Sequence, residues 1–344
     1  MEAFLIYVLF ALGLLLIIKG GDWFVSGATW VAEVTLIPKF IIGATIMSLA
    51  TTLPEIMVSS IAVMEAHEAI TAQLPDAVAF ASGKVGMAVG NAIGSFICNT
   101  GLILAIGTMF MPSEADERKF KTEAVIIGLA VVSLIALTYS GTLSSRGSIV
   151  LLAVFALYIF KNAKSFRADL EYEDFSERPP SDRKTVIVNI LKIAAGALFL
   201  FIGSRLVVNN GSDIAKSWGI SESIIGITMV AIGTSLPELV TTVIAIIKKQ
   251  PSMSVGNIIG ANVIDIALIL PLCSLIYGEF LPISKQNIFL DFPMAALVAV
   301  IAFVPTIFAR KFYRWQGVLL FLIYAAYLLV ITFWLDGYLA LFNF

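Results

Sequence analysis

Charged residues, histidine and cysteine are scarce in this sequence. Only 13% of the 344 residues are charged, whereas a soluble globular domain carries about 25%. With 59% of its residues hydrophobic, the chain does not fit an ordinary soluble domain and has the composition of a polytopic membrane protein. One histidine, His67, and two cysteines in apolar segments, Cys98 and Cys273, exclude a histidine–cysteine metal centre, and they predict no disulfide framework.

Basic residues are also missing in front of the first apolar run, MEAFLIYVLF. We therefore interpret that run as the first membrane span and not as a cleaved signal peptide. The alternating segments of about 10 residues that mark membrane β-barrels do not occur. Instead, apolar runs of about 20 residues recur, which is the length of a helix that crosses the bilayer. The sequence predicts an all-α polytopic membrane protein with ten transmembrane helices, over residues 3–33, 38–64, 84–110, 121–140, 147–161, 186–217, 222–248, 253–277, 287–309 and 314–335.

One long charged connection, which contains SERPPSDRK, divides the helices five and five. It predicts a first repeat half at 1–160, a cytoplasmic linker at 161–185 and a second repeat half at 186–344. Because five is odd, the second half crosses the membrane in the opposite sense, which makes the halves two inverted five-helix repeats. Such repeats are typical of secondary transporters, whose substrate site lies near the midplane between them.

Lysine and arginine are unevenly distributed over the predicted loops. Fifteen lie at the loops after the first, third, fifth, seventh and ninth helices: Lys39, Arg118, Lys119, Lys121, Lys161, Lys164, Arg167, Arg178, Arg183, Lys184, Lys248, Lys249, Arg310, Lys311 and Arg314. Four lie on the opposite side: Lys84, Arg146, Lys216 and Lys285. Since cytoplasmic loops collect positive residues, we expect a cell-membrane protein with both termini outside and the 161–185 loop in the cytoplasm.

A stretch that carries a proline and a glutamate occurs twice. Residues 42–55 read IGATIMSLATTLPE and residues 225–238 read IGITMVAIGTSLPE, with seven identities in fourteen positions. A second pair, MAVGNAIGSFICNTGLIL at 87–104 and MSVGNIIGANVIDIALIL at 253–270, has nine identities in eighteen. Each half thus carries the same two motifs in the same order, which supports an internal repeat.

The first motif combines the oxygen groups that bind hard cations. Pro54 and Pro237 remove a helical hydrogen bond and free carbonyl groups one turn back. Threonine and serine hydroxyls lie beside these carbonyls, and Glu55 and Glu238 directly follow the prolines. Such oxygens are suited to Ca²⁺ or Na⁺, and a carboxylate inside a membrane span indicates a functional site.

The second motif supplies a polar helix face. Three polar residues recur every four positions and so share one side of a helix. They are Asn91, Ser95 and Asn99 in the first half, and the corresponding residues in the second half are Asn257, Ala261 and Asp265. For the two asparagines at the start of each set, bracing a helix break is as good an interpretation as ion binding. The glycines of this motif are interpreted as helix-packing positions.

The paired TTLPE/TSLPE and GNAIGS/GNIIGA blocks resemble the α-repeats of the cation/calcium exchanger superfamily, closest to its prokaryotic sodium/calcium exchangers. The resemblance extends over essentially the whole chain. It implies alternating-access antiport in which Ca²⁺ leaves as Na⁺ enters, without enzymatic activity or a cofactor. The expected partners are Ca²⁺, Na⁺ (with H⁺ as the alternative) and the lipid bilayer, not nucleic acid, and a monomer is sufficient.

The same resemblance implies roles for individual residues. Glu55 and Glu238 would ligate Ca²⁺, joined by the carbonyl groups of Thr51 and Thr234. Na⁺ would use the same cluster through Ser48, Thr52, Ser95, Ala231, Ser235 and Asp265, with Asn99 beside them. The long first and sixth helices resemble the sliding gating pair of the family, which lies obliquely across the other eight.

Two departures from the family pattern leave alternatives open. Ala261 stands where the family usually has serine, and the missing hydroxyl motivates Ca²⁺/H⁺ antiport as an alternative to Na⁺/Ca²⁺ exchange. The first half also carries seventeen extra residues, since Glu55 and Asn91 are 36 apart while Glu238 and Asn257 are 19 apart. We interpret this insertion as a solvated cap. The alternative is an outer cation or pH sensor formed by Glu65, His67, Glu68 and Asp76.

Two functions from other classes also use polar residues in membrane helices. An intramembrane aspartyl protease pairs aspartates in a GxGD setting, which is absent here. A cation channel requires a continuous pore and usually oligomeric symmetry, whereas an internal inverted repeat favours a transporter that works as a monomer.

Overall fold

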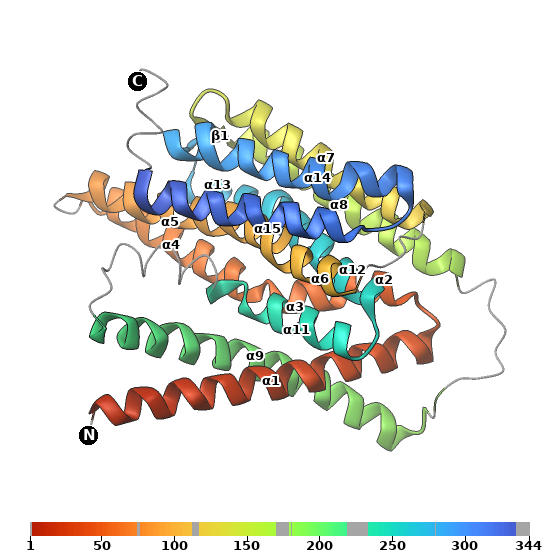
Figure 1. Ribbon diagram of the computed structural model, residues 1–344. Coiled ribbons are helices and arrows are strands. Elements are labelled where there is room, and N and C mark those ends of the chain that lie inside the picture. Colours follow the sequence, from red (N-terminus) through yellow and green to blue (C-terminus); the bar gives the residue numbers. More distant parts are fainter. Residues whose placement is uncertain are drawn as a thin grey trace.

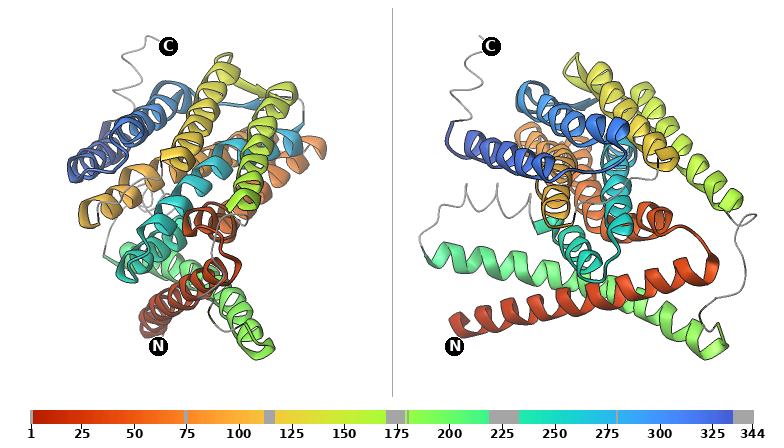
Figure 2. Two further views of the ribbon diagram at one scale, coloured as in Figure 1. Left: turned by 90° about the vertical axis from the view of Figure 1, so that its right-hand side faces the viewer. Right: turned by 45° about the vertical axis from the view of Figure 1, so that its right-hand side comes forward.

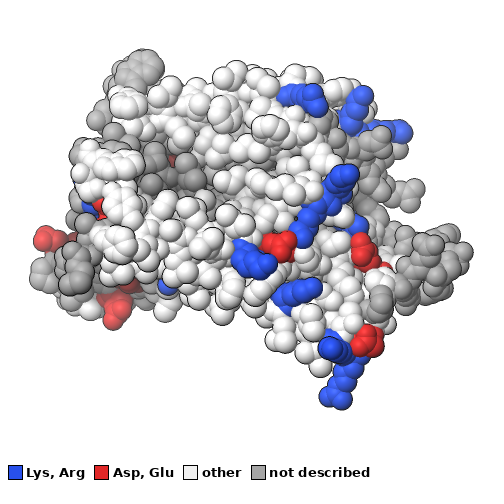
Figure 3. All heavy atoms as spheres, turned by 60° about the horizontal axis from the view of Figure 1, so that its bottom comes forward, with Lys and Arg blue, Asp and Glu red and all other residues white. Residues whose placement is uncertain are grey.

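The structure is a computed structural model that describes residues 2–73, 76–111, 117–169, 179, 181–218, 233–278 and 280–334. Nearly all of these residues lie in helices, and two long helices, α1 and α9, flank one side of a larger bundle (Figure 1). Figure 3 shows a broad uncharged surface, with lysine and arginine side chains gathered toward one end of the molecule. Such a surface fits a chain that is surrounded by lipid.

Helices α1 (Glu2–Thr35) and α9 (Arg183–Ser217) run antiparallel and cross each other obliquely (Figures 1 and 2). Glycines spaced seven residues apart let the two backbones approach closely. A Cβ atom on Gly13 would lie 3.0 Å from the Gly203 carbonyl oxygen, and one on Gly20 would lie 2.8 Å from that of Gly196. The crossing therefore depends on positions that have no side chain.

Helix α9 begins behind a side-chain cap. The carboxylate of Asp182 accepts hydrogen bonds from the hydroxyl and main-chain N–H of Thr185 and from the N–H of Lys184. These bonds satisfy N–H groups that have no partner within the helix. They hold the pKa of Asp182 below its usual value, with the Thr185 hydroxyl as the main cause.

The second predicted span is broken in two. Its first piece comprises α2 (Lys39–Ile42), the π-helix η1 (Gly43–Met47) and α3 (Ser48–Thr51). Its second piece, α4 (Leu53–Thr71), continues at an angle of 42°. The third span consists of α5 (Ala77–Cys98), the π-helix η2 (Asn99–Leu104) and α6 (Ala105–Phe110). Helices α7 (Glu117–Thr138) and α8 (Ser145–Asp169) follow.

The second half has a comparable order of elements. After α9 come α11 (Leu236–Ile247), α12 (Pro251–Ile264), η4 (Asp265–Ile269), α13 (Leu270–Tyr277), η5 (Asn287–Asp291), α14 (Phe292–Ala309), α15 (Arg314–Leu329) and η6 (Val330–Trp334). Two short strands, β1 (Thr142–Ser144) and β2 (Phe280–Pro282), pair antiparallel with Thr142 opposite Pro282. They join the two halves of the chain at one end of the bundle.

Helix α12 lies deep in the bundle, and every residue from Met253 to Ile264 is buried. It packs against α2 and η1 so closely that a Cβ atom on Gly256 would collide with the Phe40 carbonyl oxygen. A Cβ atom on Gly43 would likewise collide with the Met253 carbonyl oxygen. This contact brings the broken span of the first half against the polar motif of the second half.

The predicted membrane-spanning helical architecture is confirmed. Among the described residues, eight helices are long and apolar enough to cross a membrane, or nine if the bent pair forms one span. The predicted helix 222–248 is described only from Gly233 onward. The number ten and the inverted orientation of the halves therefore stay predictions.

Three predicted helix ends are wrong. The second helix continues to Thr71 and the third begins at Ala77, so much of the predicted cap is an extension of two helices. Alanine-rich sequence in both extensions favours this outcome. Helix α8 continues to Asp169, well into the predicted linker.

Candidate ion-binding site

Both copies of the first motif end a helix at the same place. The backbone departs from helical geometry at Thr52 (φ −85°, ψ 0°) and at Ser235 (φ −84°, ψ 8°). In each copy a new helix then starts with proline at its second position, where the missing N–H group has no partner within the helix to lose. Glu55 and Glu238 lie in the first turns of these helices and are fully buried, where the helix dipole favours a negative charge.

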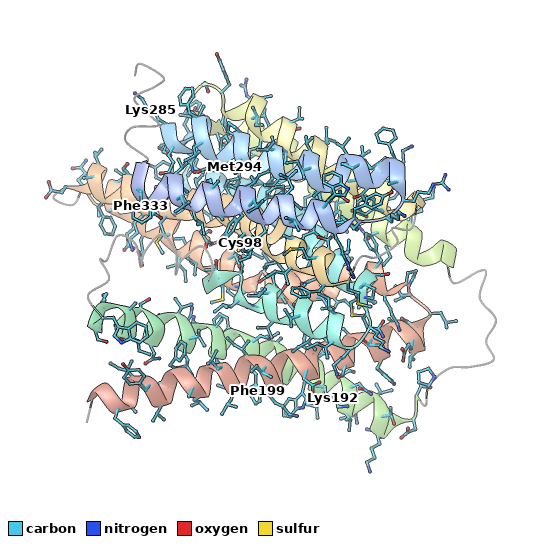
Figure 4. The ribbon with its side chains drawn as sticks, in the orientation of Figure 1. Cys98, Lys192, Phe199, Lys285, Met294 and Phe333 are labelled. Atoms are coloured by element: carbon cyan, nitrogen blue, oxygen red, sulfur yellow. The ribbon has the colours of Figure 1, made fainter. Side chains whose placement is uncertain are left out.

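Both copies of the second motif change from α-helix to π-helix at the same place. Segment η2 starts at Asn99, and η4 starts at Asp265. The Asn99 amide donates a hydrogen bond of 3.4 Å to Asp265 Oδ2. Short π-helices inside α-helices occur frequently at functional sites. In Figure 4, Cys98, the residue before Asn99, lies near the centre of the molecule, whereas Lys192 and Phe199 lie on the outlying α9.

Hydrogen bonds connect the two halves at this point. The Thr52 hydroxyl donates to Glu238 Oε1 over 3.2 Å. Ser95 donates to Glu55 Oε1 over 3.4 Å, and its hydroxyl lies 2.9 Å from that of Ser235. Two of these contacts cross between the halves, Thr52 to Glu238 and Ser95 to Ser235, while Ser95 also contacts Glu55 of its own half. Five of the predicted site residues take part in them.

Several buried oxygens of this cluster have no hydrogen-bond partner: Glu55 Oε2, Glu238 Oε2, Asp265 Oδ1, Asn99 Oδ1 and Asn91 Oδ1. Buried polar atoms are nearly always paired in folded proteins, and lipid offers no substitute. All five are acceptors, so a cation, a proton or the O–H group of a water can complete them. Among the described residues, no three acidic, histidine or cysteine side chains gather closely enough to hold a metal ion alone. An ion here therefore also requires hydroxyl, amide or carbonyl oxygens.

Further predicted site residues precede the helix breaks at Thr52 and Ser235. The Thr51 hydroxyl points to Asn257 Oδ1 and to the Ser48 carbonyl, each at 3.4 Å. The Ser48 hydroxyl donates to its own helix at Thr45. Thr234 lies one residue before the break at Ser235. Ala231 lies outside the described residues.

Two residues that sequence reasoning missed support the motif asparagines. Asn91 donates to Ser59 at 2.9 Å and to the Glu55 carbonyl at 3.4 Å. Asn257 donates to the Thr241 hydroxyl at 3.2 Å. The sequence contained evidence for this role. Ser59 and Thr241 follow the glutamates by four and three residues, so each lies on the same helix face as its glutamate.

The residues of the alternative outer sensor form no metal-binding group among the described residues. Glu65 forms an ion pair with Lys84, and His67 Nδ1 lies 2.9 Å from the Tyr277 carbonyl oxygen. The interpretation of this region as a sensor therefore has no support.

A cavity of about 330 Å³ lies beside the cluster. Pro54 and Thr234 line it on one side, and Ser204, Arg205 and Val208 of α9 line it on the other. The cavity therefore reaches the helix breaks that precede both glutamates.

Comparisons with known proteins agree with this arrangement. The chain is 33% identical over 317 residues to an uncharacterized membrane protein of Methanocaldococcus jannaschii, covering 92% of this chain and 94% of that protein. It is 28% identical over 365 residues to the sodium/calcium exchanger MaX1 of Methanosarcina acetivorans, covering 94% and 98%. A solved structure of the sodium-calcium exchanger NCX_Mj, soaked with Na⁺ and Ca²⁺, superposes with a TM-score of 0.76 at 30% identity over 94% of this chain and 97% of that chain.

The sequence model of the family described as sodium/calcium exchanger protein matches residues 5–162 and 188–333. These segments include both copies of both motifs. The chain therefore belongs to the sodium/calcium exchanger protein family, as a membrane transporter of the cation/calcium exchanger superfamily.

Proposed function

We propose that this protein exports Ca²⁺ in exchange for Na⁺ at one cluster near the middle of the membrane. Membership of the exchanger family supports cation exchange. The proposal of one shared site rests on the hydrogen bonds at the contact between the halves. There Thr52 contacts Glu238, and Ser95 contacts Glu55 and Ser235. A site built from both halves changes its access when the halves move relative to each other.

The charge of the cluster supports exclusive binding of the two ions. With Glu55, Glu238 and Asp265 ionised, the site carries three negative charges, which three Na⁺ would balance. One Ca²⁺ would leave one negative charge, which favours a proton on Asp265. Competition for the same oxygens then makes the release of one ion the condition for binding the other.

Ca²⁺ uptake into proteoliposomes tests the coupling ion. The protein is reconstituted with Na⁺ inside, and the outward Na⁺ gradient is the sole driving force, with pH clamped on both sides by buffer and a protonophore. We expect Ca²⁺ uptake that disappears when K⁺ replaces Na⁺. Absence of Na⁺-driven uptake would overturn the proposal.

Ca²⁺/H⁺ antiport is a second candidate because of Ala261. Its side chain is fully buried and has no hydroxyl where Ser95 has one in the first half. In this alternative, protons on the glutamates replace Na⁺. Uptake driven by a pH gradient in the absence of Na⁺, combined with no response to Na⁺, would select it.

A further inference from the structure

A carboxyl group outside the transport cluster is also buried within a membrane span. Glu123 of α7 is 3% exposed, and its neighbour Asn162 of α8 is 2% exposed. Asn162 Nδ2 donates to Glu123 Oε1 at 2.9 Å and to the Tyr158 main-chain oxygen at 3.1 Å. Both neighbours are acceptors, so the atom that faces them is the amide nitrogen.

This carboxyl–amide pair leaves two buried acceptors without a partner, Glu123 Oε2 and Asn162 Oδ1. Each such atom is costly in a dry interior. A protonated carboxyl group satisfies both at once. Its O–H donates to the amide oxygen, while the amide N–H donates to its other oxygen.

Asp291, another buried carboxyl group, provides a contrast. It lies at the beginning of the α14 span, much as Glu123 lies near the beginning of α7. Its Oδ1 accepts from the Tyr327 hydroxyl at 2.9 Å, and its Oδ2 accepts from Asn287 at 2.8 Å. Both oxygens of Asp291 therefore have a donor, and no additional proton is needed to complete them.

A metal cation does not fit the Glu123 pair. Hard cations such as Ca²⁺ take six to eight oxygen ligands, and the pair has two free oxygens. Of the elements packed on α7, α12, α14 and β1 contain no ionisable residue, and η4 contains only Asp265. From α8, Tyr158 and the Asn162 amide face Glu123, while Lys161 and Lys164 are exposed. Among the side chains that the structure describes, no basic group pairs with Glu123, so a proton is the simplest counter-charge.

We propose that Glu123 and Asn162 form a proton-binding site that is separate from the ion-exchange cluster. Tyr158 connects this site to η1. Its main-chain oxygen accepts from Asn162, and its hydroxyl donates to the Ala44 carbonyl oxygen. The proton on Glu123 thereby stabilises the position of Tyr158 against η1, on the side of the membrane that the basic loops predict to be cytoplasmic.

Infrared difference spectroscopy tests the proposal without a transport measurement. The purified full chain is titrated from acid to alkaline pH, and the carbonyl stretch of a protonated carboxylic acid is followed. Glu123→Gln should remove one carboxylic acid's share of this band at neutral pH, because glutamine reproduces the pair without a titrating proton. Asp291→Asn is the matched control and should leave that share in place. An unchanged band in Glu123→Gln, or a band that Na⁺ abolishes at fixed pH, would overturn the proposal.

Thermal unfolding gives a second measurement. When the proton leaves, the wild type buries a carboxylate with a single donor, so its unfolding temperature should fall as pH rises. Glu123→Gln should lack this part of the fall, and the difference between the two proteins should grow toward alkaline pH. A difference that does not change with pH would overturn the proposal, even if both proteins are folded and active.

Discussion

At the scale of single residues, two buried glutamates of opposite halves are the centre of the cluster. In each glutamate, one carboxylate oxygen accepts a hydrogen bond from a hydroxyl group, and the other, called bare below, has no hydrogen-bond partner. A bare buried carboxylate oxygen is a strong ligand for a cation, because no internal hydrogen bond has to be broken first.

We expect Glu55→Gln and Glu238→Gln each to weaken Ca²⁺ binding by at least about 10- to 100-fold, since an interaction with a charged group contributes about 1.5–3 kcal/mol and 1.4 kcal/mol is tenfold. Isothermal titration and proteoliposome flux measure it. Glu65→Gln, in an ion pair away from the cluster, is the control and should bind normally. Normal Ca²⁺ transport in either cluster variant would contradict the proposed ligands.

Ala261 is the residue that distinguishes the two candidate coupling ions. We expect Ala261→Ser to raise the apparent Na⁺ affinity by a few fold, because a hydroxyl ligand is worth about 1 kcal/mol. The Na⁺ dependence of Ca²⁺ efflux at clamped pH measures it, with Ala245→Ser on α11 as a buried control. An unchanged Na⁺ dependence would mean that another group already occupies this place.

At the scale of elements, the sequence predicted most of the helices and the motifs but not their exact geometry. The proline-containing breaks were predictable because proline cannot donate to the helix. The π-helices that begin at Asn99 and Asp265 were not, since no residue type demands a π-turn and tertiary packing decides it. The helical form of most of the insertion was not predicted, because its charged residues were interpreted as a solvated cap between two helices, while its alanine content favours a helix.

The contact of α12 with α2 and η1 depends on glycine. We expect Gly256→Ala to destabilise the protein by about 1–3 kcal/mol, the usual cost of overpacking, since its Cβ would collide with the Phe40 carbonyl group. Gly128→Ala on α7 is the control, because a Cβ there meets no described atom within 4 Å and alanine favours a helix. Unfolding in mild detergent should separate the two variants, and equal stability would mean that α12 packs differently.

At the scale of the whole molecule, and among the described residues, α1 and α9 contact each other far more extensively than either contacts the bundle. An ion pair connects α1 to α11, with Lys248 Nζ 2.7 Å from Asp22 Oδ1 and 2.8 Å from the Ser26 hydroxyl. Such partly exposed pairs contribute little to stability. A weak connection of this kind suits a pair of helices that moves as one body.

Cross-linking tests whether the pair moves. We expect a short cross-link between Asp22→Cys and Lys248→Cys to stop exchange, because it fixes α1 to α11. A cross-link between Trp23→Cys and Phe199→Cys, whose wild-type rings stack at 5.3 Å, joins α1 to α9 and should preserve exchange. Flux before and after reduction of the cross-link measures both. Full exchange in the first cross-linked protein would exclude motion of α1 against α11.

The bare oxygens of the cluster also affect how fast ion gradients would leak through the empty protein. If the protein changed its access while empty, it would carry several unsatisfied acceptors through a dry, closed state, which costs several kcal/mol. A bound ion removes that cost. In the proposed exchange cycle, the unloaded carrier would therefore return slowly, and the same atoms that attract the ions would keep the Na⁺ and Ca²⁺ gradients from being dissipated by futile cycling.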